Sequence, residues 1–382
     1  MRGGSSPSVT SVAILVDQVY ARVPGGIGTY VRELVPALAA ADPGLHITLF
    51  HARFDRPGPT EPWMRGFEVR GLRQGIRTLY PSWALAGRPA LPPEIRGADV
   101  LHAPSPAAVP PPRRGQRLVV TVHDLAFRVH PEWFPPAWRT LYRLGVRRAA
   151  RRADAIVTPS RSTALDLAGV ARARADRIRV VPLAPSLPIA KTDPGSVLAR
   201  LRVPRPYVLF VGTLEPRKNL VRLVRAYRRA VREASLPHAL ILAGPLGWRS
   251  DALLREVRLP GPGEVALTGP TSPEDLDALL RGAAAFAYPS LYEGFGLPVV
   301  EALARGVPTV VSTASSLPEV AGNAALAVDP RSVILLAGAI KRVLTDTAEA
   351  ERLSAAGRDR AGGFSWDRTA RATIDVYREA SS

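Results

Sequence analysis

One pattern recurs through the second half of the chain: a short apolar run, a loop containing Gly or Pro, and then a helical stretch. The apolar runs are Tyr207–Val211, Ala239–Ala243, Val265–Leu267 and Ala283–Tyr288. Short apolar runs separated by helices are typical of strands buried on both faces of a parallel sheet. Since crossover connections between such strands are right-handed, the repeat predicts an α/β domain with one parallel sheet.

The first half of the chain begins in the same way. An apolar strand is expected at Ser11–Val16, followed by a glycine-rich loop at Val23–Tyr30 and a helix to Ala40. Strand, glycine turn and helix in this order open a doubly wound domain. Further strands are expected at 45–50, near 100–102, at 118–122, at 155–157 and at 179–181. Residues 53–116 are dense in Pro, Gly and Arg and predict loops mixed with short elements.

The length of 382 residues suits two domains. We therefore expect an N-terminal domain over 1–185, a C-terminal domain over 186–363 and a last helix over 364–382 that crosses back to the first domain. Residues 184–205 are rich in Pro and small residues and predict the linker between the domains. The predicted fold class is α/β, with two doubly wound domains.

Composition excludes several classes of site. The chain has no cysteine, so disulfides, zinc–thiolate sites and a cysteine nucleophile are excluded. No apolar segment reaches the ~18 residues that a bilayer span needs. The first apolar run, Val12–Val16, is too short for a signal peptide. A cytoplasmic location is therefore expected.

The formal net charge is +18, and only three of the 51 basic residues are lysines. Residues 1–190 hold 26 arginines against 13 acidic residues, so an anionic partner would meet the first half of the chain. A basic helix is expected at Arg139–Arg152. It is either a solvated face or a surface for an anionic membrane, which would place the protein peripherally on the inner membrane face. Nucleic acid is disfavoured as a partner because aromatics are only 6% and no nucleic-acid-binding motif occurs.

The segment 288–308, YPSLYEGFGLPVVEALARGVP, joins two predicted strands through a glycine loop and a short helix. Pro298 suits the first helical turn, and Glu301 is expected in that same turn, near the positive end of the helix dipole. Open N–H groups in such a loop bind anions, and glycines let the backbone approach a ligand closely. A carboxylate there, Glu293, makes sense if it accepts from hydroxyls while the amides hold phosphate, as in a sugar nucleotide. Taken singly, Glu293 could be a solvated loop residue and Glu301 a helix-start stabiliser.

The two glutamates that bracket GFGLPVV, followed by ALARGVP, resemble the signature of family 4 of the retaining glycosyltransferases. The loop EPRKNL (215–220) resembles the phosphate-binding loop of that family, and VVTVHDL resembles the segment that places a histidine beside the donor sugar. The resemblance implies the GT-B architecture, in which two Rossmann-like domains face each other across a cleft. The first would bind the acceptor and the second the nucleotide sugar.

The resemblance also assigns roles to residues at matching positions. Glu293 would bind hydroxyls of the donor hexose, and Glu301 would bind the ribose. Arg217 and Lys218 would neutralise the leaving diphosphate, since Arg and Lys are the usual phosphate partners. His123, otherwise a structural histidine, would stabilise the sugar as its anomeric carbon gains positive charge. The remaining donor-binding positions are Gly28, Thr213, Gly269, Gly294, Phe295, Gly296 and Leu297.

The implied reaction moves a hexose with retention of the anomeric configuration and without a cofactor or a required metal. Asp275 and Asp277 imitate the metal-binding D-x-D of other glycosyltransferases, but they are expected on the solvated face of a helix. The segment SSLPEVAGNAALAVDP resembles bacterial mannosyltransferases, which favours GDP-mannose as donor. UDP- or dTDP-sugars are the alternative donors. A glycan, a lipid-linked sugar or a small molecule would be the acceptor. A basic protein that binds nucleic acid or a membrane is the alternative from another class.

Overall fold

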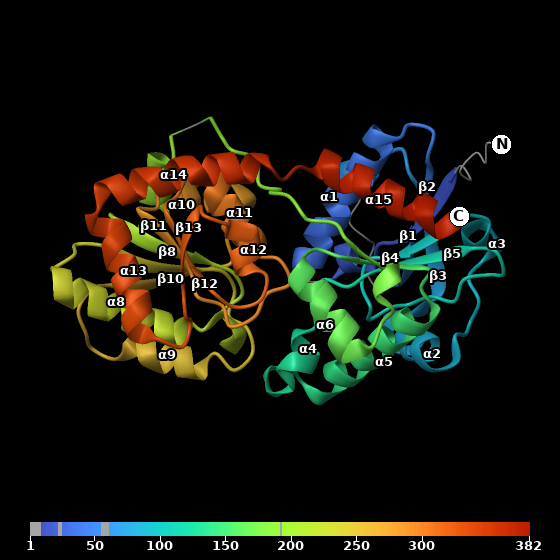
Figure 1. Cartoon of the computed structure of the whole chain (residues 1–382), viewed down its shortest axis with the longest axis horizontal. Coiled ribbons are helices and arrows are strands. Elements are labelled where there is room, and N and C mark those ends of the chain that lie inside the picture. Colours follow the sequence, from blue (N-terminus) through green and yellow to red (C-terminus); the bar gives the residue numbers. More distant parts are fainter. Residues whose placement is uncertain (1–8, 22–24, 55–60, 192) are drawn as a thin grey trace. The chain divides into compact units, whose positions relative to one another are not determined.

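The computed structural model describes residues 9–21, 25–54, 61–191 and 193–382 (Figure 1). The chain divides into two compact units, each with its own parallel sheet. The first unit comprises residues up to Leu183 together with Ser365–Ser382, and the second comprises Ala184–Phe364. The predicted α/β class with two Rossmann-like domains is confirmed.

The first unit is built on a seven-stranded parallel sheet in the order β3-β2-β1-β4-β5-β6-β7. Its strands are β1 (Ser11–Leu15), β2 (His46–Arg53), β3 (Glu68–Gly75), β4 (Val100–Ala103), β5 (Arg117–Thr121), β6 (Ala155–Thr158) and β7 (Ile178–Val180). The order of strands reverses between β1 and β4, which is the arrangement of a doubly wound sheet.

The helices of the first unit include one that begins earlier than expected. They are α1 (Gly25–Ala41), α2 (Ile76–Ala86), α3 (Pro93–Arg96), α4 (Ala126–Val129), α5 (Pro136–Arg152), α6 (Arg161–Ala171) and α15 (Trp366–Ser381). The predicted glycine loop is therefore wrong from Gly25 onward, while Val23 and Pro24 lie outside the described residues. Glycines are tolerated there because the first N–H groups of a helix need no helical acceptor.

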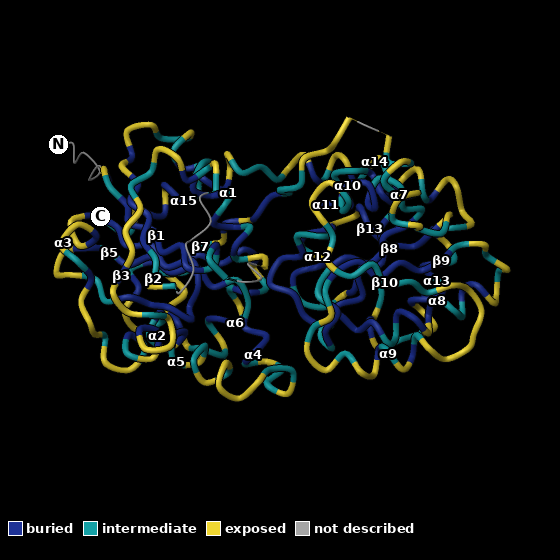
Figure 2. Tube along the Cα trace, turned by 180° about the vertical axis from the view of Figure 1, so that it is seen from behind, coloured by how far each residue is buried: buried dark blue, intermediate teal, exposed yellow. Residues whose placement is uncertain are grey.

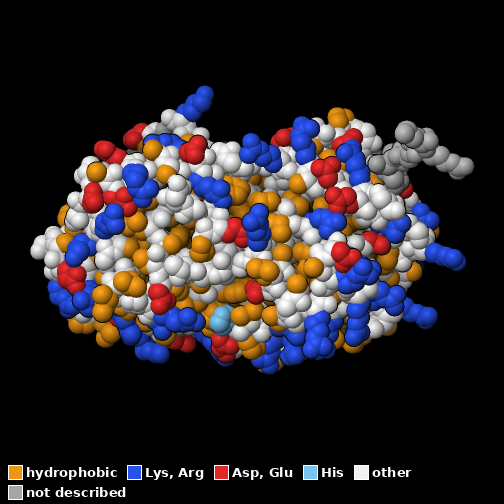
Figure 3. Space-filling model, in the orientation of Figure 1, with side chains coloured by type: hydrophobic (Ala, Val, Ile, Leu, Met, Phe, Trp, Pro, Cys, Tyr) orange, Lys and Arg blue, Asp and Glu red, His pale blue; other side chains and the backbone are white. Residues whose placement is uncertain are grey.

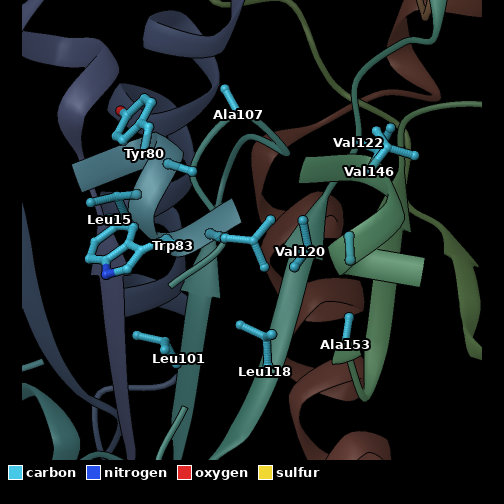
Figure 4. Packing of buried hydrophobic residues seen from close by; sticks show 14 of the residues in the cluster. Leu15, Tyr80, Trp83, Leu101, Ala107, Leu118, Val120, Val122, Val146 and Ala153 are labelled. Carbon is cyan, nitrogen blue, oxygen red and sulfur yellow. The ribbon is translucent and has the colours of Figure 1, made fainter. Parts of the chain in front are cut away.

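The core of the first unit is organised around Trp83 of α2, which is fully buried. Figure 4 shows its ring beside Leu15 and Leu101, with Leu118 and Val120 of β5 in the same cluster. The segment 53–116, predicted to mix loops with short elements, supplies β3 and α2 together with β4, the strand expected near 100–102. Its polar and proline-rich composition hides β3 and α2, because only a few of their residues face the core.

The last helix, α15, belongs to the first unit and packs against α1. The hydroxyl of Tyr377 on α15 lies 2.7 Å from Nδ1 of His102 on β4, and Nε2 of that histidine lies 2.8 Å from the hydroxyl of Thr121 on β5. Burial lowers the pKa of His102 to about 3, so the ring is neutral at neutral pH. These buried hydrogen bonds thus connect the C-terminal helix α15 to the central strands β4 and β5 of the sheet.

The second unit has a six-stranded parallel sheet in the order β10-β9-β8-β11-β12-β13. Its strands are β8 (Tyr207–Val211), β9 (Ala239–Ala243), β10 (Val265–Gly269), β11 (Ala285–Tyr288), β12 (Thr309–Ser312) and β13 (Ala325–Val328). The parallel sheet predicted from the apolar runs is confirmed. Figure 2 shows the strands of each unit as the buried centre beneath more exposed helices.

The helices of the second unit begin within the predicted linker. They are α7 (Gly195–Arg200), α8 (Leu220–Ala234), α9 (Asp251–Arg258), α10 (Pro273–Gly282), α11 (Leu297–Ala304), α12 (Leu317–Ala321), α13 (Val333–Thr345) and α14 (Thr347–Gly362). The linker prediction is therefore wrong over α7. Leu198 of α7 is buried against α10, where a Cβ on Gly282 would lie 2.5 Å from its Cδ1. In the described ranges, no helix combines the length and apolar character needed to cross a membrane.

Candidate active site

The candidate site lies where the strand order of the second unit reverses. Strands β8 and β11 are neighbours in the sheet although two other strands, β9 and β10, lie between them in the sequence. The loop after β8 contains the short 3₁₀ helix Pro216–Lys218, and the loop after β11 contains Glu293. The backbone N–H of Leu291 donates to the carbonyl of Arg217 at 2.9 Å and ties the two loops together. Ligands of open α/β sheets bind at this kind of position, beyond the carboxyl ends of the strands.

Four charged side chains meet there: Glu215, Arg217, Lys218 and Glu293, referred to below as the charge cluster. Lys218 Nζ donates to Glu293 Oε1 at 2.6 Å, and Arg217 Nη1 donates to Glu293 Oε2 at 2.7 Å. Arg217 Nε also donates to Glu215 Oε1 at 2.9 Å. Lys218 Nζ also donates to the hydroxyl of Tyr288 at 2.8 Å. The structure thus brings together the three charged residues that the sequence singled out around the glycine loop.

The charge cluster is almost removed from water, since the side chains of Lys218 and Glu293 are each 8% exposed. Burial alone would raise the pKa of Glu293, but the charges of Arg217 and Lys218 outweigh it and lower that pKa to about 2. Burial and the neighbouring Arg217 lower the pKa of Lys218, and Glu293 opposes this. Glu293 is therefore an anion at neutral pH and is hydrogen-bonded to two cations.

The loop of Glu293 is held in shape by two serines that follow β12. The hydroxyl of Ser316 donates to the carbonyls of Glu293 and Phe295 at 3.0 and 2.9 Å, and the N–H of Glu293 donates to Ser315 Oγ at 2.7 Å. Gly296 has φ +110°, and a Cβ there would lie 2.7 Å from Leu317 Cδ2, so only glycine fits. In the part of the chain that the structure describes, the N–H groups of Gly296 and Leu297 donate no hydrogen bond. Both N–H groups lie at the start of α11, a position from which free N–H groups can bind an anion.

Glu301 is the fifth residue of α11, so its predicted place in the first turn is wrong. The helix begins at Leu297 and not later, because Gly296 provides the turn that starts it. Glu301 is buried, and its Oε1 accepts from the N–H groups of Ser186 and Leu187 at 2.6 and 2.9 Å. Its Oε2 accepts from Arg305 Nη1 at 2.8 Å. Glu301 therefore anchors the start of the second unit to α11.

The Asp275–Asp277 pair does not form a solvated face as predicted. Asp277 is buried and accepts from Arg305 Nε and Arg281 Nε, both at 2.8 Å. Asp275 pairs with Arg200 of α7. Helix α10 places Asp275 beside Arg200 of α7 and Asp277 beside Arg305 at the end of α11, so both carboxylates are paired with arginines. Within the described ranges, no group of three or more His, Asp or Glu side chains could hold a metal ion.

Two other candidate positions of the second unit, Thr213 and Gly269, lie at the carboxyl ends of β8 and β10. Thr213 comes two residues after β8, and Gly269 is the last residue of β10, with φ +70°. The N–H of Gly244, after β9, donates to the carbonyl of Gly269 at 3.0 Å. A Cβ on Gly244 would lie 2.2 Å from the carbonyl oxygen of Gly212, so the backbones after β8 and β9 approach too closely for any other residue.

Two candidate residues belong to the first unit. His123 follows β5, and its Nε2 donates to the carbonyl of Pro104 at 3.0 Å. Burial lowers the pKa of His123 to about 4, so this ring is neutral at neutral pH. Its ring meets the edge of Tyr30 at 4.8 Å between centroids. Gly28 lies buried within the first turns of α1.

Several residues of the site were not predicted. Glu215 belongs to the EPRKNL loop, two residues before Arg217. A carboxylate that close to an arginine in the sequence could have indicated the ion pair. Arg305 follows Glu301 at the i,i+4 spacing of a helical ion pair. The contacts of Tyr288, Ser315 and Ser316 have no local signal, because each reaches across from another strand.

Both halves of the chain match models of known protein families. Residues 24–184 match the family model described as Glycosyltransferase Family 4, and residues 199–360 match that of Glycosyl transferases group 1. The O-antigen chain mannosyltransferase B of Escherichia coli is 32% identical over 92% of this chain and 96% of its own length. The chain belongs to the family 4 glycosyltransferases. It is an enzyme of that class with the GT-B fold.

This glycosyltransferase is also similar to a second mannosyltransferase and to a solved structure. An MMP alpha-(1->4)-mannosyltransferase of Mycolicibacterium hassiacum is 31% identical over 70% of this chain and 66% of that protein. The solved structure of Anabaena Alr3699/HepE in complex with UDP-glucose superposes with a TM-score of 0.72 at 19% identity, over 96% of this chain and 98% of that chain. At that identity the likeness is one of fold alone.

Proposed function

We propose that this glycosyltransferase moves a hexose from a nucleotide diphosphate sugar, with GDP-mannose favoured, to a hydroxyl of a glycan or lipid-linked sugar, with retention of configuration. The observation that carries the proposal is the charge cluster, in which Glu293 holds Arg217 and Lys218 beside the open amides of α11. Mannosyltransferases among the relatives favour mannose. A UDP- or dTDP-sugar with a small-molecule acceptor is the alternative.

The donor would be bound from both ends. Its diphosphate would bind the planar guanidinium group of Arg217 and the ammonium group of Lys218. It would also accept hydrogen bonds from the backbone N–H groups of Gly296 and Leu297. Its hexose hydroxyls would donate to Glu293. The ribose would donate to Glu301, whose Oε2 accepts only from Arg305 among the described residues and has room for one more donor.

Catalysis in this scheme is charge stabilisation at a prepared site. As the bond from the anomeric carbon to phosphate oxygen breaks, negative charge gathers on the diphosphate, and the two cations are already in place to receive it. The leaving phosphate would assist removal of the acceptor proton on the same face of the sugar, which retains the configuration. The neutral His123 would act through hydrogen bonding and not as a charged group. We propose that Arg217 and Lys218 make a metal ion unnecessary.

The test is a comparison of two matched charge pairs. Glu293→Ala and Lys218→Ala should each lower kcat for transfer or donor hydrolysis on the order of 10²–10³-fold, the loss typical of one charge-stabilising group. Lys341 and Glu233 form a surface pair in the same unit at 3.5 Å and provide the control. Lys341→Ala and Glu233→Ala should leave activity near wild type. Near-wild-type activity in both site variants would end the proposal.

The donor is identified separately by thermal unfolding in the presence of a panel of nucleotide sugars. A donor that binds the folded protein raises Tm by mass action. GDP-mannose is expected to give the largest shift, and that shift should disappear in Lys218→Ala but not in Lys341→Ala. A larger shift with a UDP- or dTDP-sugar would select the alternative donor. Addition of EDTA should leave transfer unchanged.

A further inference from the structure

Tyr30 of α1 contacts both His123 and the strand that precedes it. The ring of Tyr30 packs edge-to-face with the imidazole of His123, with 4.8 Å between the ring centroids. The hydroxyl of Tyr30 forms a hydrogen bond with Oγ1 of Thr121 at 3.1 Å. Thr121 is the last residue of β5 and precedes His123 by two residues, so an extended backbone points both side chains toward the same face. Tyr30 therefore holds this strand end at two points.

The hydroxyl of Thr121 belongs to a hydrogen-bonded network that continues to the last helix. It also contacts Nε2 of His102 at 2.8 Å, and Nδ1 of that ring contacts the Tyr377 hydroxyl of α15 at 2.7 Å. Tyr30, Thr121, His102 and Tyr377, referred to below as the Tyr–His network, are each at most 1% exposed. Figure 3 shows charged side chains spread over the surface of the first unit, whereas the Tyr–His network holds no charge because burial keeps His102 neutral. Buried polar groups that are paired in this way form a rigid support.

Helix α15 also supports Tyr30 by an aromatic contact. The ring of Trp366, the first residue of that helix, lies 6.3 Å from the ring of Tyr30 between centroids. Helices α15 and α1 pack against each other in the first unit (Figure 1). The end of the sequence thus fixes Tyr30 both through Trp366 and through the Tyr–His network, and Tyr30 in turn contacts His123.

The hydrogen bond of His123 determines which of its ring nitrogens carries the proton. Nε2 lies 3.0 Å from the carbonyl oxygen of Pro104, and a carbonyl can only accept, so Nε2 is the protonated nitrogen. Burial lowers the pKa of His123 to about 4, and the neutral ring holds no second proton. Nδ1 therefore has a lone pair and accepts but does not donate. Among the described residues no group donates to it, and His123 is partly exposed.

We propose that Tyr30, held by α15 and the Tyr–His network, is a positioning residue that fixes the imidazole of His123 so that Nδ1 accepts a hydrogen bond from a hydroxyl of a bound sugar. The inference rests on the proposed function, in which His123 acts on the substrate. A ring that turns about its side-chain bonds would point Nδ1 elsewhere. A misplacement of about 1 Å lowers a rate on the order of 100-fold, so a rigid support for this ring contributes directly to kcat.

The first measurement is the ¹⁵N NMR spectrum of the full chain labelled at its six histidines, with His123 assigned by comparison with His123→Ala. The wild type should show a protonated Nε2 and an unprotonated Nδ1 for His123 at neutral pH. Tyr30→Leu removes the ring contact and the hydroxyl together, and should move both signals toward the average of the two tautomers. Tyr30→Phe keeps the ring in the core and should move them in the same direction by less. Unchanged signals in these variants would overturn the proposal.

The second measurement is steady-state hydrolysis of the nucleotide sugar that gives the largest thermal shift. Tyr30→Phe should lower kcat on the order of tenfold, and His123→Ala on the order of 100-fold, with a smaller effect on the donor KM. Since Tyr30 acts through His123, adding Tyr30→Phe to His123→Ala should lower kcat no further. Losses that multiply in the double variant would overturn the proposal, and so would a wild-type kcat in His123→Ala.

Tyr227→Phe is the matched control, because Tyr227 is also fully buried and its hydroxyl donates to the carbonyls of His238 and Glu264 at 2.6 and 3.0 Å. Those carbonyls precede β9 and β10, at the sheet edge opposite to the charge cluster. The control should leave kcat and the His123 signals near wild type. An equal fall in kcat would show that lost stability, not positioning, lowers the rate, and would overturn the proposal. Loss of activity in Glu293→Ala together with a wild-type kcat in His123→Ala would overturn this inference alone and leave the proposed transfer reaction standing.

Discussion

Glu293 is the residue on which the charge cluster depends. It is buried, it faces a lysine and an arginine, and its backbone lies in a loop that two serines hold. A buried carboxylate is unfavourable unless it is paired and hydrogen-bonded. Here both of its oxygens accept from cations, so pairing outweighs the cost of burial and the carboxylate stays ionised.

The pH dependence of stability should report this pairing. The pKa of Glu293 is lowered from 4.5 to about 2, so its stabilising effect is complete above pH 4.5 and is lost as the pH falls through about 2. The difference in free energy of unfolding between wild type and Glu293→Gln should shrink by about 3 kcal/mol over that range. Urea unfolding at a series of pH values measures it. A difference that does not change with pH would contradict the ionised state of Glu293.

Helix α11 is the element that connects the loop of Glu293 to the body of the second unit. Arg305, the residue that follows the helix, donates to Asp277 of α10 and to Glu301. Glu301 in turn accepts from the backbone N–H groups of Ser186 and Leu187. The side chain of Arg305 is completely buried and donates to two carboxylates. Removing a buried partner is more costly than never having buried the pair, because a charge is left without compensation.

Arg305→Met should therefore destabilise the protein by about 3–5 kcal/mol, since Asp277 and Glu301 both lose a partner. Arg371→Met is the control. Arg371 pairs with Asp367 on the exposed surface of α15, where a pair contributes roughly 0–1 kcal/mol. Urea unfolding of both variants provides the comparison. Equal effects of the two substitutions would show that the buried network adds no more than a surface pair.

The start of α11 allows a second prediction at this scale. Gly296→Ala should destabilise the protein by about 1–3 kcal/mol and weaken nucleotide binding, because φ +110° and the contact with Leu317 both exclude a Cβ. Gly169→Ala within α6 is the matched control, since a Cβ there would meet no atom within 4 Å. That control should be neutral or stabilising by up to roughly 1 kcal/mol. Thermal unfolding with and without donor checks both effects.

At the scale of the whole molecule, the chain builds two sheets and returns its last helix to the first of them. The contact that joins α15 to the sheet is polar and buried: Tyr377 with His102, and His102 with Thr121. Because His102 remains neutral, these hydrogen bonds fix how α15 packs on the sheet without placing a charge in the core.

Tyr377→Phe should lower the free energy of unfolding by about 1–3 kcal/mol, since it leaves one nitrogen of His102 buried without a partner. Tyr20→Phe is the control, because Tyr20 is partly exposed and its hydroxyl makes no hydrogen bond among the described residues. That substitution should change stability by no more than ~0.5 kcal/mol. Donor binding, which we propose takes place on the second unit, should survive both changes.

The sequence alone determined the features that depend on local patterns. Apolar runs predicted the parallel strands of the second unit, because a strand buried on both faces must be apolar throughout. The EGFGLPVVE and EPRKNL segments predicted the family through their resemblance to its signatures, and the comparisons confirm that family. The start of α1 at Gly25 and helix α7 escaped prediction, since glycine and proline mark loops and helix ends alike.

Only the tertiary structure decided which charges pair. The sheet order places β8 beside β11 and so brings Lys218 to Glu293, Tyr288 to Lys218 and two serines to the glycine loop. It also turned Asp277 from an expected solvated residue into a buried partner of Arg305. Side-chain period and propensity act within a few residues, whereas a buried ion pair is specified by strands that meet only after the sheet has formed.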